Sequence, residues 1–517
     1  MNLTQERIAE GILFTDQYQL TMAQMYYKLG QADKTVQFDH YFRKYPDYGK
    51  HQAGYCIAAG LDSLIDWMGS ARFYLEDIDI LASQRNRFGA PIFEEGFLNW
   101  LLENGNFDKI NLRAIPEGRV VHPNIPLTTV EGPLVMAQIL ESALLNHLNY
   151  QTLIATKAAR IRDSAESRMT MEFGMRRGQG KGANAGTRAA LIGGCDYSSN
   201  VGMSHMLGFQ PKGTHAHSMI QYFKALGQSE LETFQAFADL YPDDCSLLVD
   251  TYNTLESGVP NAIKVFENLR KKGHEPVGIR IDSGDLAYLS IQSALLLNRA
   301  GFEKTSIVLS NDLDELVIWQ IQTQIQQEAG QYGIHPRDVL GRLVYGVGTN
   351  LITSEGSPAL GGVYKLVAVK NEAENNWTPA IKISEMPLKT PAPGKKQAWR
   401  IYDQRGVATA DLLGLEGENP AGAETVKTFH PTDVTKTNVL HKSQISKIEP
   451  LLIDVLKDGQ RVDGSPTIPQ MREKRVYDTT RLDTGVKRLL NPHVYHVSLT
   501  EDLYNLKQKL INENRNQ

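Results

Sequence analysis

Two histidines two residues apart, His215 and His217, lie in the segment GTHAHS (213–218). Such a pair suits a metal site, a histidine nucleophile or simply the polar residues of a turn. A zinc site needs further ligands at defined spacing, and none is evident in the sequence. A histidine nucleophile needs a neutral imidazole whose second nitrogen is held by an acceptor. Asp250, at the end of the next predicted strand, is in position to be that acceptor.

Polar and charged residues follow five predicted strands. In a parallel α/β fold, ligands bind beyond the carboxyl ends of the strands. The residues in these positions include Arg176, Asp250, Arg280, Asp282, Asn311 and Thr349. Each one alone is explained by the polar composition of turns and by helix N-capping. Five such turns on one rim of a sheet favour a ligand-binding site.

A glycine-rich turn offers a second feature with chemical meaning. Gly346 and Gly348 directly follow a predicted strand and precede Thr349, so successive backbone N–H groups are available to a phosphate. Barrels commonly bind phosphate after their late strands, although a bare GxG also makes a simple tight turn. The pattern GxxxxGK[ST] does not occur, so ATP is not expected to bind through a P-loop.

Strand and helix patterns alternate through the region that carries these residues. The predicted strands are 169–173, 246–250, 277–281, 306–310 and 342–346, and the helices that alternate with them are 184–193, 261–272, 285–300 and 314–329. Short apolar strands followed by amphipathic helices predict a parallel sheet covered by helices. Several such units within about 200 residues favour a (β/α) barrel, with a doubly wound open sheet as the alternative.

The flanking segments predict a second, mixed α/β region. A long helical pattern runs from about 133 to 165, and short β-like runs separated by Pro and Gly precede it. After about residue 371, polar Pro-rich segments and short β-like runs replace the alternation. We therefore expect an N-terminal domain at 1–135, a catalytic barrel at 136–370 and a β-rich segment at 371–517 that packs on the N-terminal domain.

Composition excludes several classes of protein. The 517 residues are 41% hydrophobic and 22% charged, and 54 basic against 59 acidic residues give a net charge of −5. That balance provides no electrostatic reason to expect nucleic acid or an anionic membrane as partner. Three cysteines are too few for a disulfide framework, and neither a signal peptide nor an apolar run of membrane-spanning length is evident. A soluble, cytoplasmic protein is expected.

Ten short motifs, in order along the chain, resemble nicotinate phosphoribosyltransferase. They are TDQYQLTM (15–22), FRKYP (42–46), EFGMRRGQG (172–180), IGGCDYSSN (192–200), GTHAHS (213–218), IRIDSGDL (279–286), YGVGTNLITS (345–354), GGVYKL (361–366), KQAWRIYD (396–403) and KRLLNPHVYHVSL (487–499). The resemblance covers about residues 12–510. It implies a type II phosphoribosyltransferase fold, with an irregular (β/α) barrel beside a mixed α/β domain built from N- and C-terminal segments, and a homodimer.

The resemblance also implies an activity. The family condenses nicotinate with phosphoribosyl pyrophosphate to give nicotinate mononucleotide and pyrophosphate, a step of NAD biosynthesis. As an enzyme of the ligase class, it couples this reaction to ATP hydrolysis through a phosphohistidine, here His217. Mg²⁺ is the expected cofactor, with no ligands assigned. His215 lies where the family tolerates other residues.

The same resemblance assigns a substrate or a role to each site residue. Nicotinate contacts are expected from Tyr18, Phe173, Thr214 and Arg280, with Tyr18 donated by the partner subunit. Phosphoribosyl pyrophosphate contacts are expected from Arg176, Asp282, Asn311, Gly346, Gly348 and Thr349. Asp250 is expected to orient His217. The structural alternatives are a core tyrosine at position 18 and a simple ion pair between Arg280 and a neighbouring aspartate.

Other activities stay open at this point. Nicotinamide phosphoribosyltransferase shares the fold, and one substitution in the pocket is enough to shift preference between the acid and the amide. A shorter quinolinate enzyme without the phosphohistidine fits less well. A catalytically silent relative that binds phosphoribosyl pyrophosphate is disfavoured by the intact His217, Arg280 and Asp282. A lyase or isomerase would need a Schiff-base lysine at a strand end. Lys365 lies near such a position, but within GGVYKL a phosphate contact is the preferred interpretation.

Overall fold

The computed structural model describes residues 3–386 and 389–515, and the chain forms two compact units. The central unit comprises Ile154–Pro358. The two-segment unit combines residues 1–153 with residues 359–517, so both ends of the chain belong to it. This confirms the predicted barrel beside a domain built from N- and C-terminal segments.

The divisions between the units fall at other residues than the expected boundaries, 135/136 and 370/371. The units separate after Leu153 and after Pro358. The helix α7 (Glu141–Ser164) continues across the first division, so no change in the sequence pattern marks it. The strand β12 (Gly362–Asn371) pairs with β1 (Thr35–Phe42), and this pairing assigns the segment to the two-segment unit.

The central unit is built on a six-stranded parallel sheet with the order β7-β6-β11-β10-β9-β8. Its strands are β6 (Thr170–Glu172), β7 (Tyr197–Ser198), β8 (Ser246–Leu248), β9 (Gly278–Ile281), β10 (Ser306–Leu309) and β11 (Leu343–Val347). β7 and β8 are the edge strands, whereas in a closed barrel they would pair with each other. The sheet is therefore a curled half-barrel, which agrees with the expected irregular barrel.

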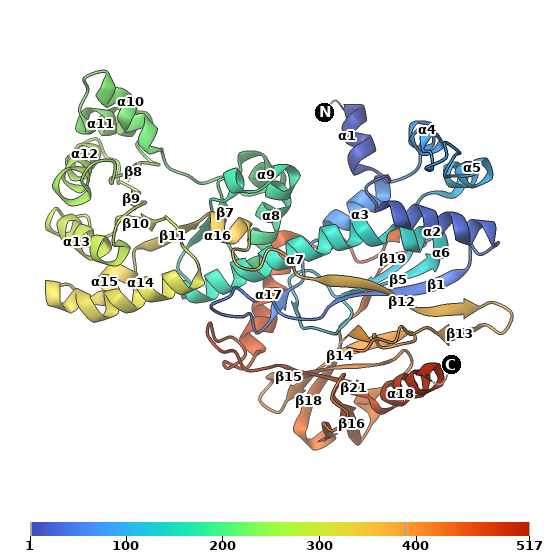
Figure 1. Ribbon diagram of the computed structural model, residues 1–517. Helices are drawn as coiled ribbons and strands as arrows, with labels where there is room; N and C mark the ends of the chain where they lie inside the picture. Colours follow the sequence, from blue (N-terminus) through green and yellow to red (C-terminus); the bar gives the residue numbers. More distant parts are fainter. Residues whose placement is uncertain (1–2, 387–388, 516–517) are drawn as a thin grey trace. The chain divides into compact units, whose positions relative to one another are not determined.

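Helices cover the outer side of this sheet (Figure 1). They are α8 (Gly180–Gly193), α9 (Val201–Met206), α10 (His217–Ala225), α11 (Glu230–Leu240), α12 (Val259–Lys271), α13 (Leu286–Arg299), α14 (Glu315–Glu328), α15 (Pro336–Leu340) and α16 (Thr349–Ile352). Asp285 and Asp314 cap α13 and α14 by accepting hydrogen bonds from the first backbone N–H groups. These caps fix where the chain turns from strand to helix, which is where the functional residues lie.

The two-segment unit contains a seven-stranded sheet, β13-β12-β1-β5-β3-β19-β20, and a six-stranded sheet, β17-β16-β21-β15-β14-β18. The strands not yet given are β2 (Cys56–Ile57), β3 (Asn111–Ala114), β4 (Val120–Val121), β5 (Thr128–Pro133), β13 (Asn376–Pro379), β14 (Lys396–Asp403), β15 (Ala408–Leu415), β16 (Thr425–Phe429), β17 (Thr437–His441), β18 (Ile445–Pro450), β19 (Ile453–Lys457), β20 (Gln460–Arg461) and β21 (His496–Thr500). In the larger sheet, three strands of the N-terminal segment lie in the middle, with two strands of the C-terminal segment on each side, so neither segment completes it alone.

Helices of the two-segment unit bury apolar residues against these sheets. They are α1 (Leu3–Glu10), α2 (Gln17–Lys28), α3 (Leu61–Ser70), α4 (Leu75–Ser83), α5 (Glu95–Asn104), α6 (Leu134–Ile139), α17 (Ile468–Arg481) and α18 (Glu501–Arg515). The main core joins the two segments directly, because the ring of Phe38 stacks on Tyr364 with centroids 4.6 Å apart. None of the described helices is both long and apolar enough to cross a bilayer.

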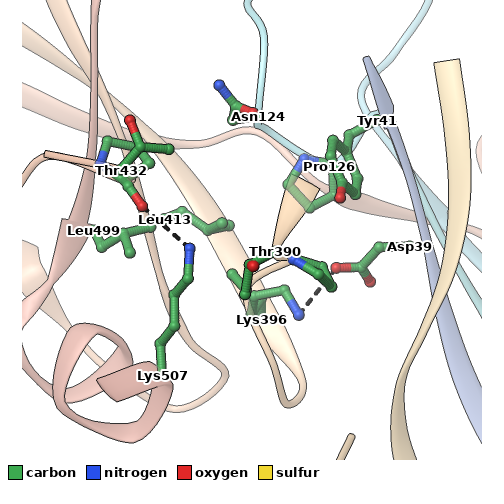
Figure 2. A pocket seen from close by; sticks show the side chains of 13 residues that line it. Asp39, Tyr41, Asn124, Pro126, Thr390, Lys396, Leu413, Thr432, Leu499 and Lys507 are labelled. Carbon is green, nitrogen blue, oxygen red and sulfur yellow. Dashed lines mark hydrogen bonds and ion pairs between the residues drawn. The ribbon is translucent and has the colours of Figure 1, made fainter. Parts of the chain in front are cut away.

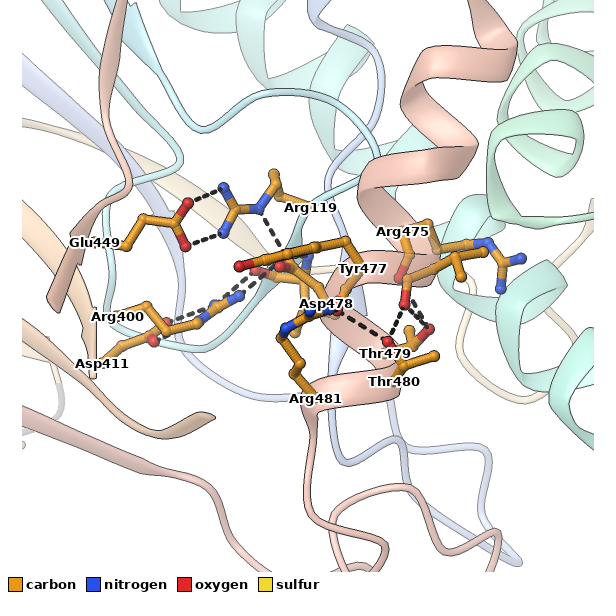
Figure 3. A network of polar contacts seen from close by, with 12 residues as sticks. Arg119, Arg400, Asp411, Glu449, Arg475, Tyr477, Asp478, Thr479, Thr480 and Arg481 are labelled. Atoms are coloured by element: carbon orange, nitrogen blue, oxygen red, sulfur yellow. Dashed lines mark hydrogen bonds and ion pairs between the residues drawn. The ribbon is translucent and has the colours of Figure 1, made fainter. Parts of the chain in front are cut away.

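A buried ion network also ties the two segments together (Figure 3). The guanidinium of Arg400 donates two hydrogen bonds to Asp411, at 2.8 and 2.9 Å, and one to Asp478 at 3.0 Å. Asp478 also accepts from the side chain of Arg119 and from the backbone N–H of Val120, both at 2.8 Å. Since removing one partner would leave a buried charge uncompensated, the network specifies how the two segments join.

Candidate active site

A cleft of about 360 Å³ opens at the carboxyl ends of the strands of the central unit. Its lining residues are Phe173, Met175, Arg176, Ser199, Gly213, Thr214 and Arg280. The cleft thus brings together four residues expected from the sequence: Phe173, Arg176, Thr214 and Arg280. They come from segments up to a hundred residues apart, and the parallel sheet places them on one rim.

Arg280, on β9, holds its guanidinium in a fixed orientation. Its Nε donates to Ser310 Oγ at 2.9 Å, Nη1 to Thr214 Oγ1 at 3.0 Å and Nη2 to Asp282 Oδ1 at 3.1 Å. A guanidinium has five N–H groups, so two of them, one on each Nη atom, have no partner within residues 3–386 and 389–515. Two N–H groups are what a carboxylate needs for a bidentate contact.

The expected ion pair with Asp282 is therefore present, but it uses only one of the N–H donors of Arg280. The Arg280 guanidinium carbon also lies 5.5 Å from the centre of the Phe173 ring. A cation and an aromatic ring side by side in one cleft suit a planar ring that carries a negative charge.

Asp282 has an acceptor left over. Its Oδ1 accepts from Arg280 and, over a short distance, from the hydroxyl of Ser310. Within the described ranges its Oδ2 accepts no hydrogen bond. Ser310, which sequence reasoning treated only as the end of a strand, therefore orients both the guanidinium and the carboxylate.

His217 and Asp250 are in contact, as expected. The Nε2 atom of His217 lies 3.1 Å from Asp250 Oδ1, and Asp250 is buried while His217 is 36% exposed. The other carboxylate oxygen of Asp250 accepts from the backbone N–H of Asp282 at 2.8 Å and from Ser283 Oγ at 2.6 Å. Asp250 therefore connects the histidine with the turn that carries Asp282. When Nε2–H donates to Asp250, the lone pair of Nδ1 is free.

His215 occupies a different environment. Its Nε2 accepts a hydrogen bond from the backbone N–H of Leu248 at 3.0 Å, and its ring lies against Phe237 with centroids 5.1 Å apart. Burial lowers the pKa of His215 to about 4, so the ring is neutral at physiological pH. His215 attaches its loop to the edge strand β8, whereas His217 faces the rim.

The same loop is attached to the opposite edge strand. The backbone N–H of Lys212 donates to the carbonyl of Ser198, in β7, at 2.9 Å. The segment from Lys212 to His215 therefore connects β7 with β8, the two strands that leave the barrel open. Thr214 and His217 are held at the rim by these attachments.

Glu172 is a buried residue that sequence reasoning treated only as part of a strand. Its Oε1 accepts a short hydrogen bond from the backbone N–H of Gly174. Its Oε2 accepts from Ser198 Oγ at 2.6 Å and from Thr187 Oγ1 at 3.1 Å. These contacts fix the turn on which Phe173 projects. The signal in the sequence is a lone carboxylate inside an otherwise apolar strand.

The glycine turn has a packing role that the sequence did not reveal. A Cβ atom at Gly346 would overlap the ring of Phe173, so glycine is required there whether or not a phosphate binds. Gly348 precedes α16, whose first residue is Thr349. Asn311 follows β10 in a left-handed conformation with φ of 90°.

Two residues considered at the sequence level belong to the two-segment unit. Tyr18 lies on α2 and is 49% exposed, which argues against a core tyrosine. Lys365 lies in β12, where its Nζ donates to the carbonyl of Tyr364 at 2.8 Å. β12 belongs to the antiparallel sheet rather than to the barrel, so the lysine that a Schiff-base mechanism would need is not at a barrel strand end.

No cluster of three or more metal-ligating side chains occurs within residues 3–386 and 389–515. His215 and His217 also point their Nε2 atoms to different partners, a backbone N–H and a carboxylate. The two histidines therefore do not form a metal pair.

Comparisons with known proteins agree with this architecture. A half-barrel with its site at the strand ends, beside a mixed domain from both ends of the chain, is the type II phosphoribosyltransferase fold. The family model described as the nicotinate phosphoribosyltransferase N-terminal domain matches residues 13–149, and that of the C-terminal domain matches residues 395–507. The chain belongs to the nicotinate phosphoribosyltransferase family.

Individual relatives span almost the whole chain. The nicotinate phosphoribosyltransferase of Bacillus subtilis (strain 168) is 35% identical over 97% of this chain and 95% of its own length. The protein of that name from Caenorhabditis elegans is 34% identical, covering 95% and 92%, and the human one is 31% identical, covering 98% and 97%.

Solved structures show the same fold. The crystal structure of human nicotinic acid phosphoribosyltransferase matches with a TM-score of 0.78 and 28% identity, covering 96% of this chain and 99% of that one. A nicotinate-nucleotide pyrophosphorylase from Pyrococcus furiosus matches with a TM-score of 0.64 at 20% identity, covering 93% and 97%.

Proposed function

We propose that this protein condenses nicotinate with phosphoribosyl pyrophosphate to form nicotinate mononucleotide and pyrophosphate, in the salvage of nicotinate for NAD biosynthesis. The observation that carries the proposal is the guanidinium of Arg280, in which two N–H groups have no partner among the described residues, beside the Phe173 ring. Nicotinate is a planar ring with one carboxylate, and these two side chains match its two parts.

The reaction requires positioning more than acid–base chemistry. The ring nitrogen of nicotinate attacks the anomeric carbon of the sugar while pyrophosphate leaves with the electron pair of the broken C–O bond. Arg280, held by Thr214, and Phe173 orient the ring, which makes the attack effectively intramolecular. The Oδ2 of Asp282, which accepts no hydrogen bond among the described residues, accepts hydrogen bonds from the hydroxyls of the ribose.

The phosphate groups of the substrate require donors on the same rim. Arg176 lines the cleft and supplies a cation that can stabilise the departing pyrophosphate. Asn311 and the turn containing Gly346, Gly348 and Thr349 supply further donors to the phosphates. Arg280 is already engaged, so it is not needed for this purpose.

ATP is the proposed co-substrate, and His217 the residue that it phosphorylates. Nδ1 of His217 attacks the γ-phosphorus of ATP, a P–N bond forms, and ADP leaves with the electrons of the broken P–O bond. Asp250 holds Nε2–H and stabilises the positive charge that develops on the ring. Because Asp250 also holds the turn of Asp282, the phosphorylated and free states are linked to substrate binding.

Mg²⁺ is proposed to accompany the pyrophosphate groups rather than to occupy a site made by protein side chains. Asp250 and Asp282 both lie on the rim of the central sheet, where Asp250 is engaged by protein hydrogen bonds and the remaining oxygen of Asp282 is assigned to the ribose. When present, the ion would neutralise phosphate charge and keep most of its ligands as water and phosphate oxygen.

A cytoplasmic homodimer is the proposed form of the enzyme. The half-exposed Tyr18 supports a site shared between subunits, in which this ring covers the nicotinate of the partner chain. In such an arrangement Phe173 and Tyr18 enclose the two faces of the substrate ring.

One set of assays tests the proposal. Purified protein is supplied with phosphoribosyl pyrophosphate and either nicotinate or nicotinamide, with and without ATP, and mononucleotide and pyrophosphate are measured. Nicotinate mononucleotide formation that ATP accelerates is the expected result. Preference for nicotinamide would overturn the assigned substrate, and absence of product with either would identify a binding protein instead.

A further inference from the structure

The two-segment unit contains a second cavity, with a volume of about 30 Å³ (Figure 2). It lies among β1, β14 and α18, and a cavity of this size holds about two water-sized groups. Its lining includes Asp39, Tyr41, Thr390, Lys396 and Lys507. All of these residues belong to the two-segment unit, whereas the residues that line the cleft belong to the central unit.

Lys507 points its amine into this cavity (Figure 2), and no carboxylate among the described residues forms an ion pair with it. Its side chain, on α18, is only 5% exposed. Its one hydrogen bond within the described residues goes from Nζ to the carbonyl of Pro431, at 3.1 Å. An ammonium group has three N–H donors, so two of them lack an acceptor.

The only carboxylate in the lining is occupied elsewhere, as far as the described residues show. Asp39 and Lys396 form a buried ion pair, with Oδ2 and Nζ 2.9 Å apart. Lys396 also donates to the carbonyl of Gly394. The pair is neutral as a whole, so Lys507 leaves the cavity with one uncompensated positive charge.

Further donors surround the same space. The hydroxyl of Tyr41 is buried and has no hydrogen-bond partner within residues 3–386 and 389–515. The hydroxyl of Thr390 accepts from the backbone N–H of Ser384 at 3.3 Å, which leaves its own proton to donate. Burial without an anion lowers the pKa of Lys507 to about 8, as expected for a cation that lacks its counter-ion.

We propose that this cavity is a binding site for a small inorganic anion, which Lys507, Tyr41 and Thr390 hold by donated hydrogen bonds. Donors exceed free acceptors around the cavity, and a buried charge is costly unless it is paired. The volume suits a chloride ion or two of the four oxygen atoms of a phosphate, and it excludes a bulky organic anion. The anion would connect α18 with β1 and so reinforce the attachment of the C-terminal helix.

Thermal unfolding in different potassium salts tests this proposal. The wild-type protein is titrated with chloride or with phosphate, and gluconate is added to keep the ionic strength constant. Gluconate is chosen because it is too large to enter the cavity. At ten times the dissociation constant, the bound anion should raise Tm by about 1 °C, and Tm should continue to rise with the logarithm of the anion concentration. The salt that produces this rise distinguishes a halide from an oxyanion.

Lys507→Met removes the charge while keeping the length of the side chain. This variant should lose the rise in Tm with chloride or phosphate concentration, and it should be at least as stable as the wild type in gluconate alone. Lys509→Met, on the exposed side of the same helix, is the matched control and should behave as the wild type. Phosphate binding elsewhere in the protein would persist in both variants and cancels in the comparison.

Two results would overturn the anion site. One is a rise in Tm of the same size in Lys507→Met as in the wild type. The other is a loss of stability in Lys507→Met that is the same in gluconate as in chloride and phosphate, which would mean that Lys507 only bonds Pro431. If Lys507→Met does not fold, Tyr41→Phe replaces it, because it removes an unpartnered hydroxyl. Tyr41→Phe should raise the anion dissociation constant several-fold, and an unchanged constant would refute the proposal.

Discussion

Replacing Arg280 with alanine should remove the preference of the enzyme for nicotinate over nicotinamide. The guanidinium is held by Ser310, Thr214 and Asp282, and two N–H groups remain for the substrate carboxylate. Because the existing contacts fix its orientation, the wild-type enzyme loses little side-chain entropy when nicotinate binds. The variant lacks both donors and the charge.

The size of the effect follows from the number and the exposure of these bonds. A hydrogen bond to a charged group contributes about 1.5–3 kcal/mol. The cleft is open to solvent, and the neighbouring Asp282 side chain is a quarter exposed, so water replaces part of the loss. We therefore expect the net loss of binding free energy to equal that of one such hydrogen bond. Since 1.4 kcal/mol is a factor of ten, KM for nicotinate should rise about 10- to 150-fold. A neutral amide loses about 0.5–1.5 kcal/mol, or about 2- to 10-fold.

Steady-state kinetics with both substrates measure this ratio, and thermal unfolding reports whether the variant is folded. Arg337→Ala is the control, because Arg337 is an exposed arginine of the same unit, on α15. A folded Arg280→Ala enzyme with an unchanged KM for nicotinate would exclude Arg280 from the substrate site. An equal loss with acid and amide would mean that Arg280 shapes the cleft without reading the carboxylate.

Four other experiments test the remaining assignments. His217→Ala should lose both ATP stimulation and acid-labile phosphate labelling from γ-labelled ATP, whereas His215→Gln should keep them; label that maps to His215 would reverse their roles. The pKa of His215 is about 4 in the folded protein, against 6.5 in the unfolded chain. Its contribution to the free energy of unfolding is therefore complete above pH 6.5 and declines by about 3 kcal/mol as the pH falls to 4. Urea titrations should show that this decline is smaller in His215→Gln. Glu172→Ala should raise KM for nicotinate about tenfold by loosening the Phe173 turn, and Glu172→Gln should restore most of it, since one oxygen still accepts from Gly174; equal losses in both variants would point to the charge instead. Mixing inactive Tyr18→Ala and His217→Ala chains should recover activity, and no recovery after subunit exchange would place Tyr18 in the site of its own chain.

The regular elements of the central unit could be predicted closely from the sequence. The expected strands at 277–281 and 306–310 are β9 (Gly278–Ile281) and β10 (Ser306–Leu309), because an apolar run between polar turns leaves little choice of position. The two-residue strand β7 is too short to give a pattern. The open edge between β7 and β8 depends on pairing between distant segments, which periodicity does not encode.

The site was predictable where topology alone decides. Arg280 and Asp282 follow a strand in a parallel sheet, so their place on the rim follows from the order of the elements. Ser310 and Glu172 could not be predicted in this way, because Ser310 contacts Arg280 and Asp282, and Glu172 contacts Thr187 and Ser198, through side chains of different segments. His215 and His217 look equivalent in sequence and separate only when one is seen to accept from Leu248 and the other to contact Asp250.

The loop between β7 and β8 has a consequence for local motion. A barrel closed by strand pairing can release one segment only by breaking a ladder of backbone hydrogen bonds. Here, among the described residues, the loop is held by separate side-chain contacts: His215 accepts from the buried amide of Leu248 in β8, Thr214 accepts from Arg280, and His217 contacts Asp250. Local opening of the rim thus requires little free energy compared with unfolding of the sheet. Hydrogen exchange at this one amide would report how often the segment that carries Thr214 and His217 detaches.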